Sequence, residues 1–276
     1  MSDLLILSGK DVSSSVYKGL SERIHALKEK GITPGLAVVL VGEDPASQVY
    51  VRSKTRTFKK LDLFTQTYRL PKDTSQDELL GLIKELNNDN SYHGILVQLP
   101  LPGQDEDEVI AAIDANKDID GFHAESQQRL EAGEPGLVPP VALAVMKLIT
   151  DTRQPLSGKH AVIVSNNPIF AGPILELMKE SQIEGRYVSP DDEAADAKIR
   201  AADIVVIAIG REQWLTKDKV KEGAILIDVG ANKTPDGAVV GDVHADARDH
   251  AAFISPVPGG VGPLTVAYLM MNTVKA

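Results

Sequence analysis

One face of an expected helix carries three side chains that could do proton chemistry together. The stretch GEDPASQVYVRSKTR, residues 42–56, is expected to start a helix near Pro45. In such a helix Ser47, Tyr50 and Lys54 lie at positions i, i+3 and i+7 and share one face. Partial burial of a lysine over an aromatic ring favours its neutral form, which can accept a proton. The spacing alone is more typical of a solvated lysine whose stem covers a packed tyrosine.

Three further stretches have polar or specialised residues where α/β proteins bind ligands. GILVQLPLP, residues 94–102, places Gln98 at the carboxyl end of an apolar strand, although a glutamine there is often simply solvated. NKDIDGFH offers Asp118 and Asp120 in a turn, where aspartates usually bond their own backbone but one could face a ligand. ISPVPGGVGPLTVA, residues 254–267, has enough glycine and proline to let backbone approach a ligand closely.

Composition restricts the classes of function. The 276 residues include no cysteine, which excludes disulfides, thiolate metal sites and cysteine nucleophiles. The net charge of −10 argues against nucleic acid as a partner. No apolar run approaches the ~20 residues that span a bilayer, and the first residues do not resemble a signal peptide. We therefore expect a soluble, cytoplasmic protein without a membrane partner.

The histidines give no indication of a metal. The six are scattered, without the paired spacing of metal ligands, so we predict no metal site. His123 and His244 are expected at the surface or behind a site.

Short apolar runs alternate with helical patterns along the chain, which predicts an α/β fold with parallel sheets. The expected strands cover 35–42, 94–100, 160–165, 202–210 and 223–230, and the expected helices cover 11–29, 45–61, 75–88, 105–115, 142–151, 171–181 and 193–201. The Gly- and Pro-containing stretch EAGEPGLVPP, residues 131–140, is the best candidate for a domain boundary. We predict an N-terminal α/β catalytic domain, 1–140 with the terminal helix 262–276, and a Rossmann-like domain, 141–261.

Taken together, the four motifs resemble the bifunctional methylenetetrahydrofolate dehydrogenase/methenyltetrahydrofolate cyclohydrolase family. The family pattern reads P-A-S-x-x-Y-V-x-x-K, G-I-L-V-Q-L-P-L-P, K-D-(V/I)-D-G-F-H and P-V-P-G-G-V-G-P-x-T-V-A, and this chain has all four in that order. The resemblance implies two α/β domains with a cleft that binds folate, usually in a homodimer, and NADP as the usual cofactor.

The resemblance also assigns roles to residues. It implies that Lys54 is the catalytic lysine, that Gln98 positions it, that Tyr50 stacks on the folate and that Asp120 hydrogen-bonds the pterin. A lysine that can gain or lose a proton suits water attack on a cationic methenyl carbon, which a permanently charged arginine does not. The rest of the implied folate pocket comprises Ser47, Leu99, Pro100, Pro258, Gly259, Gly260 and Thr265.

The expected nucleotide loop departs from the family. Where the family resembles G-R-S, this chain has Ser165, Asn166 and Asn167, and with Gly210 these are the candidate cofactor-binding residues. A Cβ in place of hydrogen crowds a pyrophosphate, and Pro168 has no N–H to offer it.

Two other places differ as well. Asp191 and Asp192 fall about where a 2′-phosphate would lie, and carboxylates there repel a phosphate but suit a ribose hydroxyl; alternatively they are the acidic start of a helix. PPVALA, residues 139–144, replaces the family's P-C-T-P-x-G near the nicotinamide. If a dinucleotide binds, these residues favour NAD over NADP.

Three hypotheses follow. The leading one is an enzyme of one-carbon metabolism that interconverts methylene-, methenyl- and 10-formyltetrahydrofolate. The second is a cyclohydrolase that has lost its dinucleotide, because water attack needs Lys54 and Gln98 but no nicotinamide. The third is a non-catalytic folate-binding protein that keeps the pocket for recognition.

Overall fold

A computed structural model describes residues 5–276 and divides them into two compact α/β units. The N-terminal unit comprises residues 15–140 and 266–276, and the C-terminal unit comprises residues 5–14 and 141–265. The prediction of a two-domain α/β protein is confirmed. No helix within the described part of the chain is long and apolar enough to cross a membrane.

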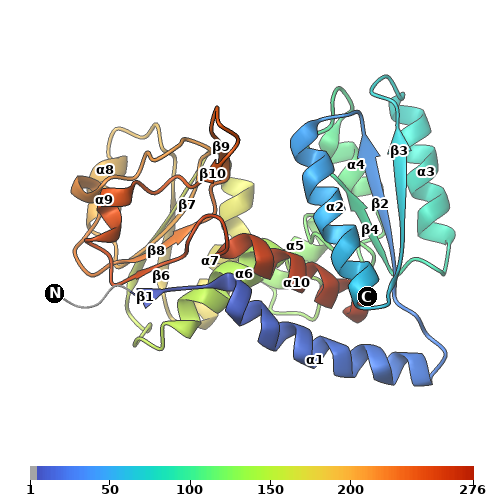
Figure 1. The fold of residues 1–276 in the computed structure, drawn as a ribbon, viewed down its shortest axis with the longest axis horizontal. Helices are drawn as coiled ribbons and strands as arrows, with labels where there is room; N and C mark the ends of the chain where they lie inside the picture. The colour runs from blue at the N-terminus through green and yellow to red at the C-terminus, as the bar shows by residue number, and fades with distance from the viewer. Residues whose placement is uncertain (1–4) are drawn as a thin grey trace. The chain divides into compact units, whose positions relative to one another are not determined.

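The N-terminal unit is built on a three-stranded parallel sheet in the order β3-β2-β4 (Figure 1). The central strand β2, Gly35–Val41, is buried along its whole length. Leu36, Val38 and Leu40 pack into one hydrophobic cluster, whereas Ala37, Val39 and Val41 pack into a second one. Because successive side chains of a strand point to opposite faces, an unbroken apolar run is required where both faces are covered. The other elements of this sheet and its layers are β3 (Phe64–Leu70), β4 (Gly94–Val97), α2 (Pro45–Lys60), α3 (Gln76–Asn88), α4 (Glu106–Ala112) and α5 (Ala124–Glu131).

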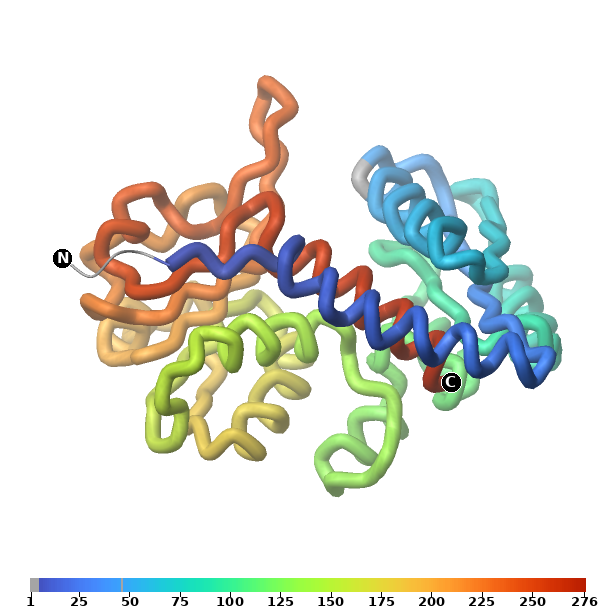
Figure 2. Tube along the Cα trace, turned by 60° about the horizontal axis from the view of Figure 1, so that its bottom comes forward, coloured from blue at the N-terminus to red at the C-terminus, as the bar shows by residue number. Residues whose placement is uncertain are grey.

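Two long helices pair on one side of this unit. Helix α1, Gly9–Glu29, and helix α10, Val261–Lys275, run side by side, as both views show (Figures 1 and 2). Leu20 and Ile24 of α1 share a buried cluster with Leu269 and Met270 of α10. Asn272 of α10 donates from Nδ2 to the carbonyl oxygens of Ile119 (2.8 Å) and Val138 (2.9 Å), which fixes the end of the chain in the N-terminal unit.

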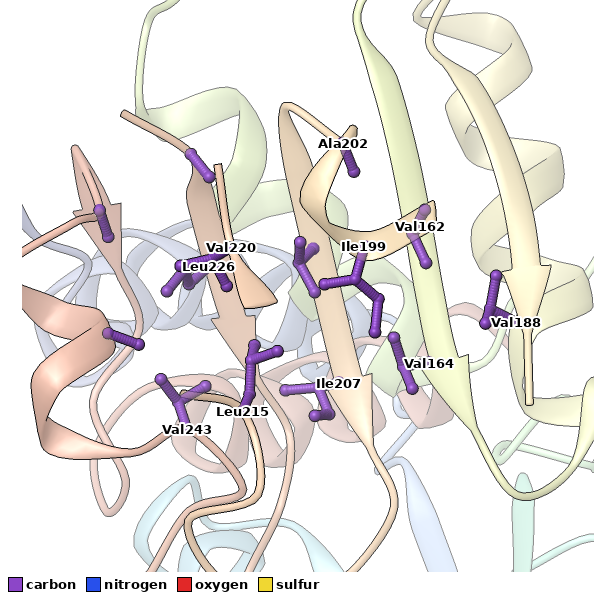
Figure 3. Close-up of a cluster of buried hydrophobic side chains, with 14 of the residues drawn as sticks. Val162, Val164, Val188, Ile199, Ala202, Ile207, Leu215, Val220, Leu226 and Val243 are labelled. Atoms are coloured by element: carbon purple, nitrogen blue, oxygen red, sulfur yellow. The ribbon is translucent and has the colours of Figure 1, made fainter. Parts of the chain in front are cut away.

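The C-terminal unit contains a six-stranded parallel sheet in the order β1-β11-β8-β7-β5-β6. The chain leaves β5 for β6 on one side and later returns to β7 on the other side, so the strand order reverses at β5. One face of the sheet is covered by a cluster of aliphatic side chains that includes Val164, Ile207 and Leu226 (Figure 3). The elements are β1 (Leu5–Ile6), α6 (Pro140–Asp151), β5 (His160–Ser165), α7 (Pro168–Glu180), β6 (Glu184–Val188), α8 (Ala195–Arg200), β7 (Ile204–Ala208), η1 (Lys217–Lys219), β8 (Ile225–Asp228), β9 (Asn232–Lys233), β10 (Val239–Val240), α9 (Ala245–Arg248) and β11 (Phe253–Ile254).

The first described residues lie in a different unit from the one that the sequence boundaries predicted. Strand β1 pairs in parallel with β11 and completes the edge of the six-stranded sheet, so residues 5–14 belong to the C-terminal unit. The contacts also divide α10 after Thr265, within the helix that the sequence assigned whole to the N-terminal domain. A two-residue edge strand has too few residues to show a hydrophobic pattern, which explains why the sequence did not reveal it.

Candidate active site

Helix α2 presents Ser47, Tyr50 and Lys54 from the start that the sequence predicts. Asp44 caps the helix by accepting a hydrogen bond from the backbone N–H of Ser47 at 2.7 Å, and Pro45 occupies the first turn. The Ser47 side chain is buried, whereas Tyr50 is 49% exposed. The exposed tyrosine therefore leaves surface that a flat ligand could cover.

The amine of Lys54 meets the amide of Gln98. Lys54 Nζ donates to Gln98 Oε1 at 3.3 Å, and both side chains are partly buried. Gln98 Nε2 donates in turn to the carbonyl oxygen of Leu99 at 2.7 Å. That second bond fixes which end of the amide faces the lysine, so Lys54 has an oriented acceptor beside it.

Strand β4 places Gln98 and the residues after it. The backbone N–H of Gln98 donates to the carbonyl oxygen of Val39 at 2.9 Å. This bond continues the pairing of β4 with β2 one residue past the end of β4. The Leu99–Pro100 peptide bond is cis, and the N–H of Leu101 donates to Glu106 Oε1 at 2.8 Å. Leu99 and Pro100 thus form part of an anchored turn directly after Gln98.

The two aspartates of the KDIDGFH motif have different surroundings. Asp118 is 2% exposed and accepts a hydrogen bond from the N–H of His123 at 2.7 Å, so it holds the turn together. Burial raises the pKa of Asp118 to about 6. Burial also raises the pKa of Asp120, and the positive charge of Lys54 acts in the opposite direction. Asp120 is therefore the member of the pair within electrostatic reach of Lys54.

A glycine allows this turn to pass under the following chain. Gly121 has φ +72°, and a Cβ at this position would lie 2.7 Å from the backbone nitrogen of Pro139. Glycine is the residue that tolerates both the left-handed backbone and the close approach.

The remaining predicted folate residues belong to the C-terminal unit. The loop with Pro258, Gly259 and Gly260 is bonded to the start of α1, because the N–H of Lys10 donates to the carbonyl oxygen of Gly259 at 3.2 Å. Thr265, on α10, donates from Oγ1 to the carbonyl oxygen of Val261 at 3.1 Å. Within the N-terminal unit the structure brings Lys54 and Gln98 into contact, with Asp120 within electrostatic reach of Lys54. Ser47 and Tyr50 lie on the same helix as Lys54, and Leu99 and Pro100 directly follow Gln98.

The loop after β5 is closed largely by its own side chains. Ser165 is buried and donates from Oγ to the carbonyl oxygen of Asn167 at 2.8 Å. Asn167 caps α7 by accepting from the N–H of Ile169 at 2.9 Å, and Pro168 is the first residue of the helix. Asn166 Nδ2 donates to the carbonyl oxygen of Ile209, 2.8 Å away beyond β7. The three residues that replace the family's G-R-S therefore brace the loop.

The acidic pair after β6 is neutralised by cations. Asp191 accepts from Arg211 Nη2 through Oδ1 at 2.8 Å and Oδ2 at 3.1 Å. Asp192 accepts from Lys198 Nζ at 2.6 Å and from the N–H of Ala194 at 2.8 Å. The hydrogen bond with Lys198 lowers the pKa of Asp192. The sequence did not single out Arg211, although its position after Gly210 at the end of a predicted strand was a usable signal.

Two buried carboxylates that the sequence did not single out support the loops after β7 and β8. Asp242 accepts from the N–H groups of Ile209 at 2.7 Å and Gly210 at 3.2 Å. Asp228 accepts from the N–H of Val243 at 3.0 Å, and burial raises its pKa to about 6. Gly210 has φ +65° and open space around it. Asp242 therefore fixes the backbone at the candidate cofactor residue Gly210.

Two of the six histidines, His123 and His244, serve as helix caps. His123 Nδ1 accepts from the N–H of Glu125 at 3.1 Å, and His244 Nδ1 accepts from the N–H of Asp246 at 3.2 Å. Among residues 5–276 no group of three or more His, Asp or Glu side chains is arranged to hold a metal ion.

Comparisons with known proteins agree along almost the whole chain. A sequence model described as "Tetrahydrofolate dehydrogenase/cyclohydrolase, catalytic domain" matches residues 7–120, and one described as "Tetrahydrofolate dehydrogenase/cyclohydrolase, NAD(P)-binding domain" matches residues 139–276. The bifunctional protein FolD of Lactococcus lactis subsp. cremoris is 42% identical over 98% of this chain and 96% of its own.

Solved structures give the same result. The crystal structure of the bifunctional enzyme FolD, a methylenetetrahydrofolate dehydrogenase/cyclohydrolase from Campylobacter jejuni, is 40% identical, with a TM-score of 0.94 over 99% of this chain and 98% of that one. The Trypanosoma brucei methylenetetrahydrofolate dehydrogenase-cyclohydrolase, solved with NADP and an inhibitor, is 32% identical. Its TM-score is 0.92 over 99% of this chain and 97% of that one.

Proposed function

Because the chain belongs to the tetrahydrofolate dehydrogenase/cyclohydrolase family, we propose that it interconverts methylene-, methenyl- and 10-formyltetrahydrofolate in one-carbon metabolism. The observation that carries the proposal is the hydrogen bond from Lys54 Nζ to Gln98 Oε1, with Asp120 within electrostatic reach. These are the three residue types, in the three motifs, to which the family resemblance assigns the chemistry. The proposal extends to a homodimer, the usual assembly of the family.

In the hydrolytic step, water adds to the cationic methenyl carbon and loses a proton. Lys54 is the group that we propose accepts this proton when its amine is neutral. Gln98 holds the amine in one orientation, because its own amide N–H is fixed on Leu99. Ring opening then leaves the formyl group on one nitrogen and returns a proton to the other.

Residues next to Lys54 and Gln98 are proposed to bind the folate. The half-exposed ring of Tyr50 offers a flat surface for stacking. Asp120 is the proposed acceptor of hydrogen bonds from the pterin. Burial raises the pKa of Asp120, and a nearby Lys54 charge favours its ionised, accepting form.

The oxidative step needs a dinucleotide, and the C-terminal unit has a place that fits one. Ligands of open parallel sheets bind at the carboxyl ends of the strands, where the strand order reverses. In this unit that position is the end of β5, beside the start of α7 and the open, positive-φ Gly210. The loop 165–167 and Gly210 would hold the dinucleotide, which supplies a hydride acceptor when bound.

We propose NAD as the better fit of the two dinucleotides. The Arg-Ser pair that the family uses for the 2′-phosphate is replaced by Asn166 and Asn167, and both side chains are engaged in bracing the loop. Asp191 after β6 is an acceptor suited to a ribose hydroxyl.

A second candidate, a cyclohydrolase without dehydrogenase activity, is favoured by one observation. Asn167 already occupies the N–H of Ile169 at the start of α7, and Pro168 has none to offer, so this helix end has fewer donors for a pyrophosphate.

Two assays on the purified protein decide between these candidates. Hydrolysis of methenyltetrahydrofolate is followed first, and then reduction of NAD and of NADP with methylenetetrahydrofolate. Both activities, with NAD preferred, are the expected result. Hydrolysis without reduction of either dinucleotide would establish the second candidate, and absence of both activities would contradict the proposal.

A further inference from the structure

One ion pair spans the place where the dinucleotide is proposed to bind. Asp191 follows β6 and Arg211 follows β7, while β5 lies between these two strands in the sheet. Arg211 Nη2 contacts both carboxylate oxygens of Asp191, at 2.8 and 3.1 Å. The pair therefore links the two strand ends that flank β5 and the loop that starts at Ser165.

Both partners are of the types that distinguish the two dinucleotides. In Rossmann-like units an acidic residue after the second strand accepts a hydrogen bond from the ribose 2′-hydroxyl, and a nearby arginine accommodates a 2′-phosphate. Asp191 stands after the second strand of the β5-α7-β6 unit, and Arg211 is in direct contact with it. An arginine held by a carboxylate is not free to bind a phosphate.

The pair is exposed enough to open. The Asp191 side chain is 71% exposed and that of Arg211 is 42% exposed. Ion pairs in such positions contribute little to stability, so a ligand can replace either partner. Asp192 differs, because Lys198 of the adjacent helix α8 and the N–H of Ala194 hold it locally.

We propose that the Asp191–Arg211 ion pair sets the choice between NAD and NADP. The inference rests on the proposed dehydrogenase function and deepens it. While the pair is closed, Asp191 occupies a guanidinium that could otherwise meet a 2′-phosphate at this strand end. Asp191 thereby disfavours NADP in two ways, by its own charge and by its hold on Arg211.

The two single substitutions are expected to act in opposite directions. Asp191→Asn releases Arg211 and removes a negative charge, so the preference should move towards the 2′-phosphorylated ligand by about tenfold, the size of one charged hydrogen bond. Arg211→Gln leaves Asp191 without its cation, so the preference should move towards the unphosphorylated ligand. Glu184→Gln is the matched control, because Glu184 is an exposed ion-pair carboxylate (66% exposed) at the amino end of β6, and it should leave the ratio of the two dissociation constants within about twofold.

The readout is direct binding rather than turnover. Dissociation constants of ADP-ribose and 2′-phospho-ADP-ribose are measured by calorimetry for the full-length wild type and the three variants, with thermal unfolding to verify that each is folded. Opposite shifts in Asp191→Asn and Arg211→Gln, with an unchanged ratio in Glu184→Gln, are the expected result. Unchanged ratios in both test variants, with measurable binding, overturn this inference alone. Absence of binding by the wild type overturns it together with the dehydrogenase half of the proposed function, while hydrolysis of methenyltetrahydrofolate is unaffected.

Discussion

Lys54 Nζ lies 3.3 Å from Gln98 Oε1, and this contact joins the third turn of helix α2 to the carboxyl end of strand β4. The two residues are 44 positions apart in the sequence. The amide is fixed from its other end by the carbonyl oxygen of Leu99 at 2.7 Å. The direct hydrogen-bond acceptor of Lys54 is therefore a neutral amide whose orientation is fixed.

Replacement of Gln98 by glutamate tests the importance of that neutral acceptor. A carboxylate at position 98 favours the charged form of Lys54 and loses the donor to Leu99, so its position is less fixed. We expect Gln98→Glu to lower kcat for hydrolysis of methenyltetrahydrofolate by at least about tenfold, within the range of general-base effects. Steady-state kinetics of the variant measure this. A kcat equal to that of the wild type would show that the amide is not required.

The turn that carries Asp120 depends on glycine at position 121. Gly121→Ala combines a left-handed backbone with a Cβ placed 2.7 Å from the nitrogen of Pro139. We expect a loss of about 1–3 kcal/mol in the free energy of unfolding and weaker folate binding. Gly133→Ala is the control, because Gly133 has φ +68° but open space around it. The free energy of unfolding of both variants is measured by urea denaturation. Gly133→Ala should lose only the cost of backbone strain, about 1 kcal/mol, and the additional loss in Gly121→Ala then reports the collision with Pro139.

Asp228 makes stability depend on pH in a definite direction. Burial raises its pKa to about 6, so the folded protein keeps a proton that the unfolded chain loses near pH 4. The stabilisation is fully present below pH 4 and disappears as the pH rises through 6. Asp228→Asn removes this titration. The stability of the variant, measured relative to that of the wild type, should therefore be higher at pH 7 than at pH 4.

The size of that effect follows from the shift, which corresponds to about 3 kcal/mol. The difference in unfolding free energy between wild type and Asp228→Asn is measured at pH 4, 5, 6 and 7. Asp62→Asn, at an exposed carboxylate whose pKa is lowered by Lys28, is the control with the opposite sign. A difference that does not change with pH would show that Asp228 titrates in the folded protein as it does in the unfolded chain.

Much of the fold is predictable from local patterns. The helix from Pro45 and the strand that starts at Gly35 were predicted to within a residue, because a cap and a two-sided apolar run are local signals. Strands β3 and β6 were missed. FTQTYRL in β3 has four polar residues among seven and no regular alternation, and EGRYV in β6 is mostly polar with glycine as its second residue. Both are edge strands, which need fewer apolar residues than central strands.

The candidate site was predictable only as separate motifs. The resemblance assigned Lys54 and Gln98 to one site, and the structure brings their side chains together. The same motif left Asp118 and Asp120 undistinguished until burial and hydrogen bonds separated them. The position of Arg211 after Gly210 was a local signal, but its contact with Asp191 depends on β5 lying between β6 and β7, and the local sequence does not determine that strand order.

The most direct test of the account is hydrolysis of methenyltetrahydrofolate by Lys54→Met, compared with Lys59→Met. Lys59 is an exposed lysine on the same helix, so the control removes the same charge away from Gln98. Folate binding is measured in parallel by calorimetry. The account predicts that Lys54→Met still binds folate but loses hydrolysis by at least about a hundredfold, while Lys59→Met keeps it. Hydrolysis at the wild-type rate in Lys54→Met would contradict it.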